Sequence, residues 1–229
     1  MKRQATRGVS TLEFALSLMV LVPLILGTGA IGINMIRTLQ TVQLARDAGH
    51  MFARGVDFSS STGAGNQQIL ATLGTGMGLS ATTGQGTAIV ILSALTYVDG
   101  PTCTASNQYN NTGVAPTCTN LGLWVFTQRL EIGNTSMRTS NFGSPLTSGP
   151  TGVTLDSHGQ IDVGQYGSKA GAVANFSAAN GINPYTVSAG GAVSGLPSRQ
   201  KLFLAETAAQ GFGMPPFVAG SPTYSFAFF

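Results

Sequence analysis

The stretch RGVSTLEFALSLMVLVPLILGTGAIGI at residues 7–33 decides the fold of this chain, because a basic leader meets a long apolar segment there. Residues 14–33 are twenty residues without a charge. At about 1.5 Å per residue, a helix of that length is ~30 Å long, the thickness of a bilayer's hydrocarbon core. Lys2, Arg3 and Arg7 precede it with no acidic residue among them, so the positive-inside rule places the leader in the cytoplasm. The sequence therefore predicts a single-pass membrane protein whose remaining residues lie outside the cytoplasm.

One carboxylate, Glu13, lies at the start of the apolar segment. On insertion scales a carboxylate at the centre of a membrane helix costs about 2.5–3.5 kcal/mol, so Glu13 needs a partner or an interfacial position. If a peptidase cut after Gly8, Val9 would carry a new ammonium, and Glu13 would lie one helical turn away. The two groups could then pair between neighbouring subunits. The alternative is a Glu13 that merely flanks a signal anchor at the membrane surface.

These residues resemble the processing site of type IV prepilins, in which a glycine is followed by a hydrophobic residue and the fifth mature residue is glutamate. Within that superfamily the chain is most similar to TadE-like pseudopilins of the tight adherence (Flp) pilus. The resemblance lies in LEFAL at residues 12–16, Pro23, and LARDAGHMFAR at residues 44–54. Major Flp pilins end soon after their helix, whereas this chain continues with a large extracytoplasmic portion. The resemblance therefore favours a minor pilin.

The resemblance implies a structural function in pilus assembly and surface attachment. The chain would be inserted in the bacterial inner membrane, trimmed after Gly8 by a prepilin peptidase, and assembled into or beneath the pilus. The implied partners are that peptidase, the major Flp pilin, other pseudopilins and the inner-membrane assembly platform. A membrane-anchored adhesive or binding protein that never enters a filament is the first alternative. An exported enzyme on an anchor is the second.

Two further features concern the helix itself. Pro23 predicts a bend, because proline removes one helix hydrogen bond and crowds the preceding turn. Apolar residues at helical spacing continue past the span and predict a helix that ends at about Arg54.

A secretory signal peptide cut after Ala30 is a competing interpretation. The apolar core is longer than the roughly 7–15 residues usual for a signal, and the hydrophobic pattern continues beyond that cut.

After residue 54 the composition changes to Gly, Ser, Thr and Asn, which divides the chain into a leader (1–8), a helix (9–54) and a head (55–229). Residues 59–65 indicate a linker or surface loop, and a short helix follows over 67–73. Four segments have strand character: 87–98, 123–132, 201–209, which is also compatible with a helix, and 224–229. The predicted fold class is α+β, with an antiparallel β-sheet packed on the long helix and long Gly/Ser-rich loops, the layout of type IV pilins.

Cys103 and Cys118 are the only cysteines, and both lie in the portion assigned outside the cytoplasm. Such a pair across a loop predicts a disulfide. Closing a loop of about 15 residues stabilises by roughly 3 kcal/mol in the chain-entropy model. The alternative is two free thiols or a redox pair, and it is disfavoured because the spacing is unlike the Cys-x-x-Cys motif of redox pairs.

Composition and motifs argue against other classes of function. Only 8% of residues are charged and the net charge is +3, so no basic surface of the density that nucleic-acid binding requires is expected. Asp156, His158 and Asp162 form the one acidic and histidine cluster, in a Gly-rich loop. Such residues could hold a metal or perform acid–base chemistry, but turn residues at a surface explain them as well. No cofactor, metal or catalytic residue is predicted.

Overall fold

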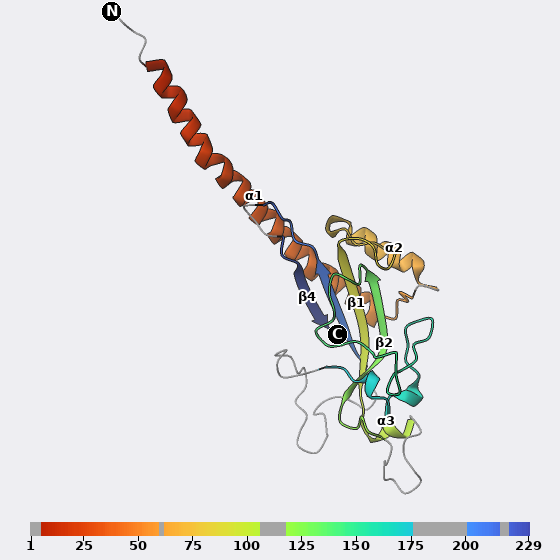
Figure 1. The fold of residues 1–229 in the computed structure, drawn as a ribbon. Helices are drawn as coiled ribbons and strands as arrows, with labels where there is room; N and C mark the ends of the chain where they lie inside the picture. The colour runs from red at the N-terminus through yellow and green to blue at the C-terminus, as the bar shows by residue number, and fades with distance from the viewer. Residues whose placement is uncertain (1–5, 60–61, 106–117, 176–200, 216–219) are drawn as a thin grey trace, which may run out of the picture.

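The computed structural model describes residues 6–59, 62–105, 118–175, 201–215 and 220–229. Its first element is α1 (Thr6–Ala53), a single helix of 48 residues. The N-terminal half of α1 projects away from the rest of the chain, and its C-terminal half lies against the head (Figure 1). The prediction that the helix ends near Arg54 is confirmed.

A four-stranded antiparallel sheet forms the centre of the head, with strand order β2-β1-β3-β4. Its strands are β1 (Ala88–Tyr97), β2 (Trp124–Gly133), β3 (Lys201–Ala209) and β4 (Thr223–Phe228). The four segments with strand character are thus all strands, including 201–209, where the sequence left strand and helix open. The α+β class and the antiparallel sheet are confirmed.

The sheet is covered on both faces. Val90 and Leu92 of β1 share one buried cluster with Phe52 of α1, because the docked half of α1 crosses that face along β3 and β4. Leu95 of β1 lies in a second cluster with Phe142 and other side chains of residues 134–175, which cover the opposite face. Every residue of β1 is therefore buried, as its nearly continuous apolar sequence predicts.

The described part of the head also contains the helices α2 (Ala64–Leu73) and α3 (Gly100–Ala105) and the 3₁₀ turns η1 (Thr75–Met77), η2 (Val163–Gln165) and η3 (Ala170–Ala172). The turn between α1 and α2 is more compact than the predicted linker or surface loop, because Phe58 and Ser59 are fully buried there. The side-chain amide of Gln67 donates to the Phe58 carbonyl oxygen at 2.6 Å and fixes the turn against α2.

The predicted disulfide between Cys103 and Cys118 is present, with Cα atoms 6.0 Å apart. It joins α3 to the segment that leads into β2, and both sulfur-bearing residues are buried. The bridge therefore fixes the end of the sheet where β1 ends and β2 begins.

Candidate functional site

The projecting half of α1 is an exposed apolar surface. Its mean hydropathy reaches 2.3 over an 18-residue window, so the helix is long and apolar enough to cross a membrane. The large apolar side chains that are more than half exposed in residues 12–31 are Leu12, Phe14, Leu16, Met19, Val20, Leu21, Leu24, Ile25 and Ile31. Large exposed apolar surfaces of this kind mark sites of contact with a membrane or with other proteins.

The residues predicted for processing and assembly lie near the start of this surface. Gly8 and Val9 are in the first turns of α1, which begins at Thr6. Glu13 is exposed, and within the described residues no ion pair includes it. The helix is continuous through Pro23, so the bend there stays a prediction.

Polar contacts join α1 to the loop between β3 and β4, at the C-terminal end of the exposed apolar surface. The side-chain amide of Asn34 donates to the carbonyl oxygen of Phe212 at 3.0 Å and accepts from the Phe212 backbone N–H at 2.7 Å. Arg37 donates through Nη1 to the Gln210 carbonyl oxygen at 2.7 Å. These contacts, the Asn34–Phe212 clamp, set the level on α1 at which the head begins.

Further along α1, small residues allow close packing of the head. Phe229 lies so near Gly49 that any Cβ at this position would overlap the phenyl ring. The same ring lies 4.4 Å from the His50 ring, and Phe52 meets Phe203 edge-on at 5.4 Å, between centroids. The docked half of α1 is therefore fixed by aromatic packing as well as by the clamp.

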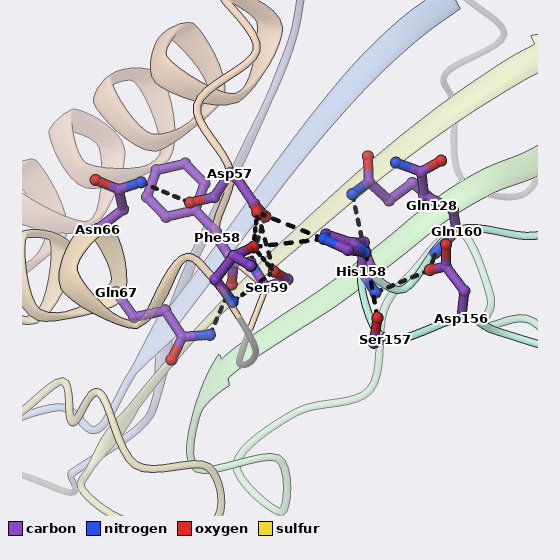
Figure 2. A network of polar contacts seen from close by, with 11 residues as sticks. Asp57, Phe58, Ser59, Asn66, Gln67, Gln128, Asp156, Ser157, His158 and Gln160 are labelled. Atoms are coloured by element: carbon purple, nitrogen blue, oxygen red, sulfur yellow. Dashed lines mark hydrogen bonds and ion pairs between the residues drawn. The ribbon is translucent and has the colours of Figure 1, made fainter.

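A polar network joins the turn after α1 to the loop that follows β2 (Figure 2). The Asp57 carboxylate accepts from the Ser59 backbone N–H at 2.8 Å, from the Ser59 hydroxyl at 3.1 Å and from the Thr62 hydroxyl. The His158 Nε2 atom lies 3.9 Å from Asp57 Oδ2 and 3.4 Å from Thr62 Oγ1. The hydrogen bond from the Thr62 hydroxyl is the largest cause that lowers the pKa of Asp57 below its ordinary value, and the bond from the Ser59 N–H is the second.

This network does not have the arrangement of a catalytic triad. Asp57 and Thr62 both approach Nε2 of His158, while Nδ1 lies 3.3 Å from the Ser157 hydroxyl. A Ser-His-Asp triad places its hydroxyl and its carboxylate at opposite ring nitrogens. The geometry instead holds two distant chain segments together.

The carboxylates of the candidate acidic cluster bind backbone groups. Asp156 accepts from the N–H groups of His158 and Gln160, both at 2.8 Å, and Asp162 caps a 3₁₀ turn by accepting from Gly164 at 2.7 Å. In the described part of the chain, no three His, Cys, Asp or Glu side chains come together as a metal site would need. Asp156 and Asp162 are thus turn residues. The burial of Tyr166, followed by the nearby Asp162 charge, raises the pKa of Tyr166 to about 12.

A buried charged network lies on the sheet face away from α1. Glu206 on β3 and Arg129 on β2 have side chains that are 1% and 4% exposed, with Oε2 and Nη1 3.9 Å apart. Glu206 also accepts from the Tyr224 hydroxyl at 2.6 Å, and Arg129 donates to Ser93 at 2.8 Å. Burial, followed by the Glu206 charge, raises the pKa of Tyr224. Sequence patterns did not predict this network, although a charge inside an apolar strand is a signal of a buried partner.

Comparison of the chain with protein-family models, with curated proteins and with solved structures found no match. Its function is therefore inferred from its own residues. Among the described residues, most of the exposed large apolar side chains lie on α1.

Proposed function

We propose that the chain is a TadE-like minor pilin of a tight adherence (Flp) pilus, processed after Gly8 by a prepilin peptidase. The observation that carries this proposal is the division of α1 into an exposed apolar half with one carboxylate and a half docked on a β-sheet head. Lipid would surround the exposed half before assembly, and helices of other pilins would surround it afterwards. The function is structural, in pilus assembly and surface attachment.

Glu13 and Val9 would set the register of assembly. Glu13 makes no ion pair with the described part of its own chain, so its carboxylate is free for a group of another subunit. The ammonium that cleavage creates at Val9 is such a group. Because two charges in an apolar surrounding are stable only when they meet, helices would slide past one another until the pair forms.

The charges and the disulfide support the proposed orientation in the membrane. The basic leader would stay in the cytoplasm, α1 would cross the bacterial inner membrane, and the head would face the extracytoplasmic side. The bond between Cys103 and Cys118 supports this orientation, because disulfides persist in oxidising compartments. The partners would be the peptidase, the major Flp pilin, other pseudopilins and the inner-membrane platform.

Processing is tested by the N-terminus of the membrane-extracted protein, expressed with its prepilin peptidase and measured by intact mass and terminal sequencing. We expect a start at Val9 for the wild type and loss of that start for Gly8→Leu. Gly27→Leu is a matched control in the same helix, because its Cβ would meet open space. An uncut leader in the wild type would overturn the proposal and favour the membrane-anchored binding protein. A start at Ile31 would favour a secreted protein.

Assembly is tested separately with Glu13→Gln. This variant should be cut after Gly8 as the wild type is, but its amount in sheared pili should fall by about tenfold or more, because a charge-assisted contact is worth about 1.5–3 kcal/mol. Asp47→Asn is the control, since Asp47 is an exposed acid in the docked half of α1. Equal incorporation of both variants would contradict the role assigned to Glu13.

A further inference from the structure

The connection between β3 and β4 runs along α1 toward its N-terminus. β3 meets α1 first near the C-terminal end of the helix, where Phe203 packs on Phe52. Its continuation then reaches Arg37 through Gln210 and Asn34 through Phe212. Figure 1 shows the described parts of this connection beside α1, beyond the ends of the strands.

The cover on α1 extends past the Asn34–Phe212 clamp. Ala30 lies one turn before Asn34 on the same face and is 0% exposed, whereas its neighbours Gly29 and Ile31 are exposed. The four-residue step from Ala30 to Asn34 corresponds to about 6 Å along the helix. The cover ends before Gly27, because a Cβ added to Gly27 would have no neighbouring atom within 4 Å. The head therefore reaches a level of α1 that belongs to its charge-free segment, residues 14–33.

The two limbs of the β3–β4 loop pack against one another, and the loop carries no charged side chain. Its two limbs contact one another, since the Gln210 side chain donates to the Gly220 carbonyl oxygen at 2.7 Å. A Cβ at Gly220 would lie 3.0 Å from the Gly211 carbonyl oxygen, so the limbs pack closely. From residue 207 to residue 229 the sequence carries no charged side chain. The apolar side chains of the loop's first limb, residues 210–215, are Phe212, Met214 and Pro215.

We propose that the β3–β4 loop is a second membrane contact, with Phe212, Met214 and Pro215 in the interfacial layer of the bilayer beside α1. This inference rests on the membrane span of the proposed function. If residues 14–33 fill the hydrocarbon core, Asn34 lies at its outer boundary, and the clamp places Phe212 at the same depth.

Lipid fits this loop chemically. Backbone groups near hydrocarbon need internal partners, and the loop finds them in Asn34, in Arg37 and across its own limbs. The Arg37 guanidinium lies 6.0 Å from the centre of the Phe212 ring, which places a cation at the level of lipid phosphates. Two contacts with the bilayer, α1 and the loop, would fix the direction in which the head faces.

Depth measurement on the full chain in phosphatidylcholine and phosphatidylglycerol vesicles tests this proposal. Met214→Cys and Pro215→Cys are each labelled with a nitroxide, while the native cysteines are held in their disulfide. The relative collision rates with oxygen and with a water-soluble nickel complex then give the depth. Ile31→Cys is the reference inside the span, and Leu121→Cys is the aqueous reference, since both side chains are more than half exposed.

We expect both loop labels about 5–10 Å below the headgroups, as for an interfacial helix. Loop labels with the nickel access of Leu121→Cys, while Ile31→Cys lies in the bilayer, would overturn the loop contact and leave the span intact. Low access to both reagents would mean protein cover and would overturn the assignment to lipid. An Ile31→Cys label in water would overturn the span and the loop contact together. A retained disulfide and an unchanged near-ultraviolet circular dichroism spectrum show that each variant is folded.

Discussion

Replacing Glu206 by glutamine removes a buried charge from the network that joins β2, β3 and β4. The carboxylate accepts from the Asn141 N–H at 3.1 Å, from the Tyr224 hydroxyl at 2.6 Å and from the Ser140 hydroxyl, and it faces Arg129 at 3.9 Å. A glutamine retains one acceptor oxygen and introduces an NH₂ group, which cannot accept. The variant therefore loses at least one hydrogen bond to a charged group and leaves the Arg129 charge without its buried partner.

The expected cost is a large fraction of the free energy of unfolding of a typical domain. Breaking a buried ion pair by removing one partner costs about 3–5 kcal/mol, and each hydrogen bond to a charged group contributes about 1.5–3 kcal/mol. Because glutamine keeps part of the hydrogen bonding, we expect a loss of about 3 kcal/mol. Glu131→Gln is the matched control. Its side chain contacts the same Arg129 at 3.3 Å but is 35% exposed, so its loss should be about 0–1 kcal/mol.

The assay is urea unfolding of the full chain in detergent micelles with the disulfide intact. Trp124 is the only tryptophan and is buried in the head, so its fluorescence reports the unfolding of the head. With a slope of about 2 kcal/mol per molar urea, the midpoint for Glu206→Gln should fall by about 1.5 M. If the two glutamine variants unfold within about 0.5 kcal/mol of each other, the buried network does not stabilise the head in the way argued.

Three other predictions concern single features of the head. Cys103→Ser opens a loop closed across 15 residues and should lower the free energy of unfolding by roughly 3 kcal/mol, and a wild-type sample treated with reductant should match it. Gly49→Leu should displace the Phe229 ring from α1 at a cost of about 1–3 kcal/mol in urea unfolding; an unchanged midpoint would show that the ring is not held there. The folded-state pKa of Tyr166 is raised from 10.0 to about 12, so its contribution to stability is complete below pH 10 and is lost as the pH rises toward 12. Tyr166→Phe should therefore lose less stability than the wild type between those pH values, and equal alkaline losses would contradict the burial of this hydroxyl.

Secondary structure was predictable here because its signals are local. The uncharged run and the helical spacing after it determine α1, and apolar β-branched runs determine β1 and β2. Lys201–Ala209 shows the limit of such signals. Its leucine, alanine and glutamate residues suit a helix as well as a strand, and pairing with β1 and β4 makes it a strand.

The contacts that give the head its position were not predictable in the same way. Asn34 and Phe212 are 178 residues apart in sequence, and Thr62 and His158 are 96 apart. No periodic pattern links such pairs. The cover formed by residues 134–175 depends on similar contacts, since the Asn120 side chain donates to the carbonyl oxygens of Tyr166 and Lys169. Side chains that bond to distant backbone groups leave no trace in spacing or composition.

The two leading interpretations of the chain are a minor pilin and a membrane-anchored binding protein. They differ in what surrounds the part of α1 that lies beside the head. A simple anchor needs apolar side chains only within the bilayer. Met35 and Ile36 lie at the outer end of the charge-free run, just before Arg37, and Leu39 lies beyond it, yet they are 66%, 57% and 63% exposed. At this level the head covers one side of α1, through Asn34, and leaves these three side chains uncovered. A solitary anchor would leave Met35 and Ile36 beside the lipid headgroups and Leu39 beside water, at a free-energy cost, whereas the helices of neighbouring pilins would bury all three side chains. The exposed apolar surface thus continues to the level of the head, and this continuation favours assembly of the proposed minor pilin into a filament over a solitary anchor.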